Sequence, residues 1–372
     1  MLVLGLGLGA SASIARSHDL FGANARASLL TPDDPGGTEQ REGWTRLQWN
    51  FAGPEGVGAP RAWGNVAAAG APGGEGVIVA VLDTGVAYPG NKYGRPASPD
   101  LSASGFVPGY DFVDDDDDPY DVNGHGTHVA STIAEETDNG YGVTGLAYGV
   151  RVMPVRVLDR NGDGDATTVA RGLRYATDNG AKVINLSFNF APNITEQQIP
   201  EIVSAIRYAH ERGTFIVAGA GNASRRRVTY PARDDEVVAV GATTEHGCLA
   251  SYSNYGTGLD LVAPGGGRDA NIVNQRACRP GRLGSPIYQI TLDERSRTHF
   301  ELTGFIGTSM ASPHVAATAA LVVASGVAGE NPSPAAIEAR LKQTARDLGS
   351  PGVDRLYGAG LVDAAAATAR QP

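Results

Sequence analysis

The sequence predicts an α/β protein of three layers, in which helices cover both faces of a mostly parallel central sheet of about seven strands. Short apolar runs rich in β-branched residues recur along the chain, at 77–82, 151–158, 182–186, 214–218, 236–242 and 259–263. They are apolar throughout rather than alternating, which is typical of parallel strands buried on both faces. Segments with helical periodicity separate several of them, at 127–136, 167–179 and 197–213. A last helix is predicted to begin at Ser333 and Pro334 and to end at Gly349.

The first 45 residues precede this alternation of strands and helices and do not share it. Leu2 to Ala10 form an apolar run too short to span a bilayer, and Ala10-Ser11-Ala12 has the small residues of a signal-peptidase site. We therefore expect a signal segment at 1–12, a short pro-segment or linker at 13–45, one folded domain at 46–368, and secretion. Gly5, Gly7 and Ala10 also match a dinucleotide-binding fingerprint, but Asp33, its acidic residue, lacks the second strand that this site requires.

Composition excludes several classes of partner. The chain has 372 residues, 42% of them hydrophobic, and a formal net charge of −10. An acidic protein of this kind lacks the positive surface that nucleic acids and anionic membranes require. No run of about eighteen uncharged apolar residues occurs, so we expect no membrane partner. The two cysteines, Cys248 and Cys278, lack the spacing of a zinc site and form one disulfide or remain two thiols.

The residue types of nucleophilic catalysis follow predicted strands or begin predicted helices. Asp83 follows a buried strand, His125 begins a helix, and Ser309 precedes an apolar helix with Pro313 in its first turn. In a parallel sheet such residues gather at the carboxyl ends of the strands. A serine hydroxyl becomes nucleophilic when a neutral imidazole takes its proton and a carboxylate holds the ring in one tautomer. Asn222, after another strand, is placed to donate a hydrogen bond to an oxyanion.

Four motifs resemble the signatures of the subtilisin-like serine proteases. They are DTGV (83–86), GHGTHVAS (124–131), AGAGN (218–222) and GTSMASPHVA (307–316), and they follow that family's order Asp, His, Ser. The resemblance extends from about Gln48 to Ala367. It implies a triad of Asp83, His125 and Ser309 with Asn222 in the oxyanion hole. It also implies a secreted, monomeric endopeptidase that cleaves extended polypeptides through an acyl-enzyme, with broad specificity and an apolar residue before the cleaved bond.

The resemblance also implies Ca²⁺ as a structural cofactor at one or two sites. The ligands of the first site would be Gln48, Asp100, Thr137, Asn139, Tyr141 and Val143. Those of the second would be Asp111, Asp114, Asp116 and Asp118, whose spacing matches a calcium loop of heat-stable relatives. A solvated acidic loop is the alternative interpretation of this second run. The segment from Asp159 to Gly164 begins like an EF-hand, but Ala170 stands where that loop needs glutamate.

The resemblance likewise implies residues that contact the substrate. Gly162, Asp163 and Gly164 would pair with the substrate backbone as an added strand. The first specificity pocket would be lined by Leu186, Ser187, Phe188, Asn189, Ala218, Gly219, Ala220 and Thr229. None of these carries a carboxylate, so the pocket should accept an apolar side chain rather than Lys or Arg. Asp163 and Asp165 predict a mild preference for basic side chains at the preceding subsites. A Cys248–Cys278 disulfide would tie the insertion 267–301 to the core.

Two other functions compete with this interpretation. A calcium-binding secreted protein could keep the same fold without activity, yet this sequence retains all four of Asp83, His125, Ser309 and Asn222. An esterase of the α/β-hydrolase type needs a G-x-S-x-G motif and the order Ser, Asp, His, and Ser309 meets neither condition. His128, three residues after His125, is interpreted as a packing residue, since a metal pair there lacks a third ligand.

Overall fold

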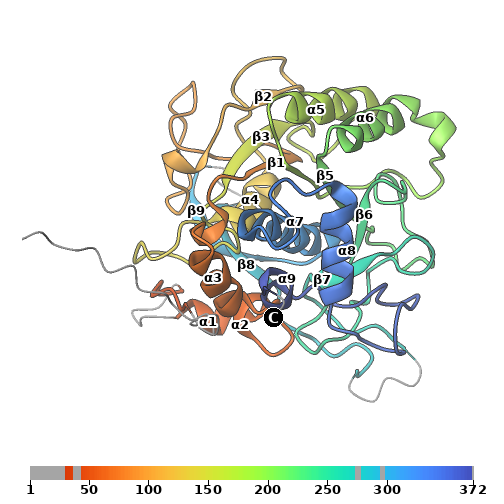
Figure 1. Ribbon diagram of the computed structural model, residues 1–372. Helices are drawn as coiled ribbons and strands as arrows, with labels where there is room; N and C mark the ends of the chain where they lie inside the picture. The colour runs from red at the N-terminus through yellow and green to blue at the C-terminus, as the bar shows by residue number, and fades with distance from the viewer. Residues whose placement is uncertain (1–29, 37–42, 273–277, 294–297, 371–372) are drawn as a thin grey trace, which may run out of the picture.

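The computed structural model describes residues 30–36, 43–272, 278–293 and 298–370, and it shows one parallel sheet between two layers of helices (Figure 1). Within those residues seven strands form the sheet in the order β2-β3-β1-β4-β5-β6-β7, and every neighbouring pair is parallel. The strands are β1 (Ile78–Asp83), β2 (Tyr110–Asp111), β3 (Arg151–Arg156), β4 (Val183–Leu186), β5 (Phe215–Gly219), β6 (Val238–Thr243) and β7 (Leu261–Pro264). The predicted α/β class with a parallel sheet is confirmed.

The two faces of the sheet carry separate hydrophobic cores, because successive strand residues point to opposite faces. In β1, Val79 and Val81 belong to one core, and Ala80 and Leu82 belong to the other. The first core includes α3 (Ala59–Ala68), α4 (His125–Ala134) and α7 (Thr308–Ser325), and the second includes α5 (Ala166–Asp178) and α6 (Pro200–Glu211). The other helices of the described residues are α1 (Trp44–Leu47), α2 (Trp49–Ala52), α8 (Pro334–Thr344), α9 (Ala364–Thr368) and the 3-10 turns Pro72–Gly74, Ala103–Gly105 and Glu196–Gln198.

Local capping and hydrophobicity explain why these segments are helical. Asp165 precedes α5 and accepts hydrogen bonds from the N–H and hydroxyl of Thr168, at 3.0 and 2.8 Å. Ser333 caps α8 by accepting from the N–H of Ala336 at 3.2 Å. Almost every residue of α7 is buried, since that helix is apolar on all sides and runs through the first core.

Some predicted boundaries were wrong. Helix α8 ends at Thr344 rather than Gly349, because Ala345 is extended and Arg346 pairs with Leu361 instead. Pro313 lies inside α7 rather than in its first turn. Sequence patterns also missed the two-residue edge strand β2, which is too short to show a period.

An antiparallel hairpin that the sequence did not predict begins within the insertion at 267–301 and continues beyond it to Phe305. Its strands β8 (Ile287–Leu292) and β9 (Phe300–Phe305) pair in register from Ile287–Phe305 to Leu292–Phe300. The hairpin packs on α4. Thr291 Oγ1 donates to the carbonyl of Gly124 at 2.5 Å, and Ser131 Oγ donates to the carbonyl of Ile290 at 3.2 Å. The inserted chain therefore supports the helix that begins at His125.

Part of the expected pro-segment packs on the folded domain. Asp34 is buried and accepts hydrogen bonds from the N–H groups of Asp138 and Asn139, at 3.1 and 3.2 Å. The indole of Trp44 donates to the carbonyl of Pro32 at 2.8 Å. The packed part of the chain thus begins before position 46. The predicted signal segment 1–12, together with residues 13–29 and 37–42, lies outside the described residues.

Two features bear on compartment and membranes. A disulfide joins Cys248 to Cys278 with their Cα atoms 5.6 Å apart, and it links the end of the β6 region to the insertion. Among the helices that the structure describes, none is long and apolar enough to cross a bilayer.

Replacing both cysteines, as Cys248→Ala with Cys278→Ala, should lower the free energy of unfolding by roughly 3–4 kcal/mol. The bridge joins positions 30 residues apart and so restricts the unfolded chain. Differential scanning calorimetry should show a lower Tm for the double variant. A reductant should lower the Tm of the parent protein and leave the Tm of the double variant unchanged. Two reactive thiols in unreduced, denatured protein would contradict the pairing.

Candidate active site

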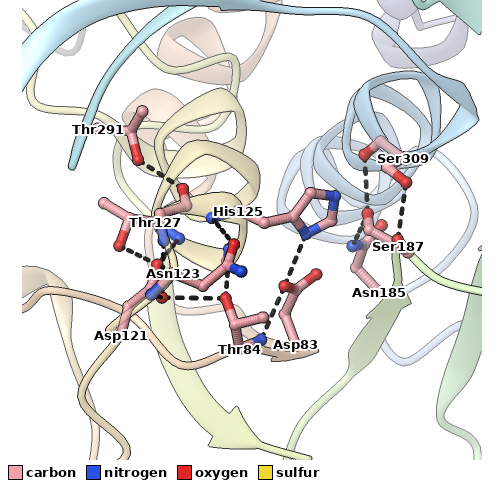
Figure 2. A network of polar contacts seen from close by, with 12 residues as sticks. Asp83, Thr84, Asp121, Asn123, His125, Thr127, Asn185, Ser187, Thr291 and Ser309 are labelled. Atoms are coloured by element: carbon pink, nitrogen blue, oxygen red, sulfur yellow. Dashed lines mark hydrogen bonds and ion pairs between the residues drawn. The ribbon is translucent and has the colours of Figure 1, made fainter. Parts of the chain in front are cut away.

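Asp83 is the last residue of β1 and lies at the carboxyl edge of the sheet, where its side chain is fully buried. Its Oδ1 lies 2.7 Å from Nδ1 of His125, and it also accepts the N–H of Thr84 at 2.7 Å. A carboxylate can only accept, so Nδ1 carries the ring proton and Nε2 is left as the basic nitrogen of a neutral ring. Figure 2 shows the ring extending from α4 toward the start of α7.

His125 is the first residue of α4, and glycines on both sides make that position possible. Gly124 has a left-handed φ of 109°. A side chain on Gly126 would place its Cβ 2.1 Å from the carbonyl oxygen of Gly85, next to Asp83. The helix therefore reaches the end of β1 only because position 126 has no side chain. This close approach brings the imidazole within hydrogen-bonding distance of the carboxylate.

The electrostatic surroundings of His125 make its ring a stronger base than a free imidazole. Burial alone would lower its pKa, but the charge and hydrogen bond of Asp83, with a smaller effect of Asp121, raise the pKa above the ordinary imidazole value. His128, one turn further along, is different. Burial lowers the pKa of His128 to about 3, its Nε2 lies 3.0 Å from the carbonyl of Ile287, and its ring stacks on Phe305. His128 is therefore a neutral packing residue.

Ser309 lies in the first turn of α7 and is bound to Ser187 twice. Its hydroxyl donates to the carbonyl of Ser187 at 2.8 Å, and its own carbonyl accepts from Ser187 Oγ at 2.8 Å. The second bond exists because Pro313, four residues on, has no N–H to offer that carbonyl. Leu186 pairs with Leu82 in adjacent parallel strands, so Ser187 and Asp83 leave the sheet side by side. The structure thus brings Asp83, His125 and Ser309 to one edge (Figure 2).

Asn222 follows β5 and is oriented by the residue before Ser309. Its Oδ1 accepts hydrogen bonds from the N–H and the hydroxyl of Thr308, at 2.9 and 3.0 Å. The amide nitrogen therefore points away from Thr308. A methyl group on Gly307 would lie 3.5 Å from Asn222 Nδ2 and 3.6 Å from the backbone nitrogen of Ser309. Both donors border one small space that the glycine leaves open.

The residues predicted to line the first specificity pocket fall into two groups. Phe188 is partly exposed and Asn189 is exposed at the surface. The other residues are buried, several in the second core, so they offer substrate at most their backbone atoms: Leu186, Ser187, Ala218, Gly219, Ala220 and Thr229.

The predicted substrate-binding loop at 162–164 is exposed. The N–H groups of Gly162 and Asp163 are bonded within the turn, to the carbonyl and the carboxylate of Asp159. Gly164 lies between this turn and Asp165, which caps α5. Its missing side chain matters, because a Cβ there would lie 2.6 Å from the carbonyl of Val157.

At the predicted first calcium site, the structure brings several proposed ligands together. Asp100 is fully buried, and its oxygens accept from Asn139 Nδ2 at 2.6 Å and from the N–H of Val143 at 3.1 Å. Asn139 Oδ1 accepts the N–H of Tyr141 at 2.8 Å. Gln48 instead bonds both backbone groups of Thr144, at 2.7 and 3.1 Å.

At the predicted second site, a guanidinium already neutralises part of the acidic run. Arg156 Nη1 lies 2.6 Å from Asp111 and 2.5 Å from Asp114. Asp118 accepts the hydroxyl of Tyr88 at 2.7 Å, and Asp116 accepts the hydroxyl of Tyr93 at 3.0 Å. In the described part of the chain, no three His, Cys, Asp or Glu side chains are grouped as ligands of one metal ion.

Sequence reasoning missed three buried acids near these sites. They are Asp34 and Glu135, which lie near the first calcium loop, and Asp121, which lies near His125. An aspartate shortly before a helix start is a capping signal, so Asp121 could have been found in DVNGHGTH. Nothing local marks Asp34, whose partners are about a hundred positions away.

Comparison with known proteins agrees with this arrangement. The Subtilase family model (Peptidase_S8) matches residues 74–360. Subtilisin Savinase of Lederbergia lenta is 41% identical over 298 residues, which cover 79% of this chain and 91% of that protein. A thermophilic serine proteinase of Bacillus sp. (strain AK1) is 38% identical over 286 residues, or 77% of this chain and 60% of that longer protein.

Solved structures show the same relationship. A protease from Pseudoalteromonas arctica PAMC 21717 aligns with a TM-score of 0.71 and 31% identity, over 91% of this chain and 99% of that one. A cold-adapted subtilisin-like serine proteinase aligns with a TM-score of 0.61 and 29% identity, over 78% of this chain and 89% of that one. The family match over most of the chain, with these identities, shows that the chain belongs to the subtilase family and is a serine endopeptidase.

Proposed function

We propose that this endopeptidase uses Ser309 as the nucleophile, His125 as the general base and Asp83 as the carboxylate that orients the base. The contact of 2.7 Å between His125 Nδ1 and Asp83 Oδ1 carries the proposal. It leaves Nε2 free to take a proton and stabilises the imidazolium that follows. Ser309 is held at the same sheet edge by Ser187, within the first turn of α7.

In the structure the Ser309 hydroxyl donates to the Ser187 carbonyl rather than to His125. Rotation about the Cα–Cβ bond of Ser309 would turn the hydroxyl toward Nε2. Catalytic hydrogen bonds are often loose in a free enzyme and tighten only when substrate binds. The hydroxyl would then attack the scissile carbonyl while His125 takes its proton and later returns it to the leaving amine.

The developing oxyanion would lie in the space next to Gly307. Asn222 Nδ2 and the backbone N–H of Ser309 border that space, and the N-terminal end of α7 adds a partial positive charge. Thr308 holds Asn222 by its oxygen, so the donor needs no reorganisation when charge develops. Water would then hydrolyse the acyl-enzyme through the same groups.

The substrates that fit this site are extended polypeptides with an apolar side chain before the cleaved bond. The residues expected around that side chain include Phe188 and no carboxylate, so a cationic side chain would find no partner. The exposed loop Gly162–Gly164 would pair with the substrate backbone, and Asp163 within it would favour basic side chains at preceding subsites. We also propose that the protein is a secreted monomer, which agrees with a disulfide between Cys248 and Cys278.

Ca²⁺ is proposed as a structural cofactor, held first at the loop of Asp100 and Asn139. Asp100 is buried with neutral hydrogen-bond partners, and its pKa rises to about 7 through burial and the charges of Asp34 and Glu136. Buried acids of like charge fit a hard cation with oxygen ligands. The carbonyls of Thr137, Tyr141 and Val143 would complete the shell. At the acidic run, Arg156 already pairs with two carboxylates and offsets one of their charges, so a second ion would bind there more weakly.

Ser309→Ala should lower kcat on casein by about 10⁶, the loss found when a subtilisin's own triad serine is removed. A serine-directed covalent inhibitor should label the parent and leave this variant unlabelled. Among peptide anilides, those with Phe or Leu before the bond should be cleaved faster than those with Lys or Glu. Ser325→Ala, at the far end of α7, is the control and should keep full activity. Cleavage by Ser309→Ala would refute the assigned nucleophile.

Asn222→Ala should lower kcat by about 10²–10³ with little change in KM, a range that comes from a subtilisin's own oxyanion asparagine. The amide acts on charge that exists only in the transition state, so ground-state binding is spared. Steady-state kinetics on one peptide anilide measures both constants. Asn179→Ala, at the exposed end of α5, should leave them unchanged. A rise in KM at constant kcat would assign Asn222 to substrate binding instead.

Removal of calcium should lower Tm, because an ion at a hundred times its Kd contributes about 3 kcal/mol to the folded state. Because folding raises the pKa of Asp100, the free energy of unfolding without calcium should fall as pH rises from about 4 through 7. The shift on chelation should therefore be larger at pH 8 than at pH 5. Asp100→Asn should abolish most of the Tm shift on chelation, whereas Asp178→Asn on α5 should leave that shift unchanged. Equal Tm values with calcium and with chelator would contradict the site.

A further inference from the structure

Asp121 is a fully buried carboxylate on the loop that leads into α4, four positions before His125. Its Oδ1 accepts hydrogen bonds from Thr84 Oγ1 at 3.0 Å and from the N–H groups of Asn123 and Gly124 at 2.8 and 2.9 Å. Its Oδ2 accepts from the N–H and the hydroxyl of Thr127, at 2.9 and 2.7 Å. These five donors are all neutral groups.

Thr84 connects this carboxylate to the Asp83–His125 contact. The N–H of Thr84 donates to Asp83 Oδ1 at 2.7 Å, and its hydroxyl donates to Asp121. The same hydroxyl oxygen accepts the N–H of Gly126, the residue after His125, at 2.9 Å. The end of β1 and the first turn of α4 are therefore tied together on both sides of His125, as Figure 2 shows.

Helix capping alone does not account for Asp121. The residue in the N-cap position of α4 is Gly124, and Asp121 stands three positions earlier. A capping side chain typically accepts one or two N–H groups at an exposed helix end, and a neutral serine or asparagine does this well. Burying a charge without a cation is costly unless several donors satisfy it. Burial raises the pKa of Asp121, and the hydrogen bonds from Gly124, Thr127 and Asn123 oppose that rise and favour the charged form. So many donors gathered on one buried carboxylate beside His125 indicate a role that depends on its charge.

We propose that Asp121 is a positioning residue of the active site. Its charged carboxylate holds the first turn of α4 against Asp83 through Thr84, and its field stabilises the imidazolium of His125. The inference rests on the proposed function only in taking His125 as the base. The charged groups that act on His125 are Asp83 on β1 and Asp121 itself, which both raise its pKa. His128, on the same helix, stays neutral because burial lowers its pKa to about 3.

Asp121→Asn tests the proposal because it keeps the shape of the side chain and removes its charge. We expect kcat to fall between about ten- and a hundred-fold, the cost of a small misplacement of catalytic groups, with little change in KM. The acidic limb of the profile of kcat/KM against pH should move to lower pH. Loss of a neighbouring negative charge destabilises the imidazolium, so His125 loses its proton at lower pH.

A second readout does not depend on activity. In the Ser309→Ala background, NMR titration of the His125 ring should give a lower pKa with Asp121→Asn than without it. Asp363→Asn is the matched control, because Asp363 caps α9 with its carboxylate and is not among the charges that act on His125. That control should leave both the pH limb and the NMR titration unchanged.

Thr84 provides a variant that leaves Asp121 in place. Thr84→Val removes the hydroxyl between Gly126 and Asp121, and Thr84→Ser restores it. We expect kcat to fall with Thr84→Val and to recover with Thr84→Ser. If the two residues act through one network, Thr84→Val combined with Asp121→Asn should cost less than the product of the single losses.

An unchanged His125 titration in Asp121→Asn, with kcat lost only in proportion to folded protein, would overturn the proposal. If Asp121→Asn does not fold, an unchanged kcat in Thr84→Val overturns it equally. Failure of the proposed function is distinguishable from either result. Cleavage by Ser309→Ala would refute the nucleophile, whereas the NMR shift would still show that Asp121 acts on His125.

Discussion

The register between β1 and β4 is the constraint on which the proposed active site depends. Leu82 pairs with Leu186, so Asp83 and Ser187 leave adjacent strands at the same level. Asp83 then contacts His125, and Ser187 contacts Ser309. A slip of one residue would turn each side chain to the opposite face of the sheet and separate these contacts. The apolar residues of β1, which alternate between the two cores, stabilise the register against such a slip.

Two helices carry the other two residues of the proposed triad, His125 and Ser309. α4 reaches the sheet edge at His125 because glycines stand on both sides of it, and α7 presents Ser309 from within the first core. Pro313 interrupts the hydrogen bonding of α7, and the hydroxyl of Ser187 takes the free carbonyl. Pro313 would weaken an ordinary helix. Here it helps to hold the turn of Ser309, because it makes a second hydrogen bond between α7 and Ser187 possible.

The buried carboxylates Asp83, Asp121, Asp111 and Asp100 have three different kinds of partner. Asp83 and Asp121 accept from the imidazole and from backbone or hydroxyl donors, so their charge remains close to His125. Asp111 pairs with the guanidinium of Arg156. Asp100 has only amide donors, and burial raises its pKa, which is why a cation is proposed there. The partner of each carboxylate is therefore a better guide to its proposed role, in catalysis or in structure, than the number of acidic residues around it in the sequence.

The sequence by itself determined the fold class, through apolar strands that alternate with helices, and its short motifs in a specific order predicted Asp83, His125, Ser309 and Asn222 as the catalytic residues. These features are local, so a stretch of a few residues contains them. The tertiary structure alone decided that Arg156 pairs with Asp111 and Asp114 of the acidic run, that Asp34 packs on the loop after α4, and that the hairpin β8–β9 supports α4. Each of these contacts joins segments at least 40 positions apart, and the physical reason they escape sequence analysis is that their energy comes from burial and geometry, which no local pattern encodes.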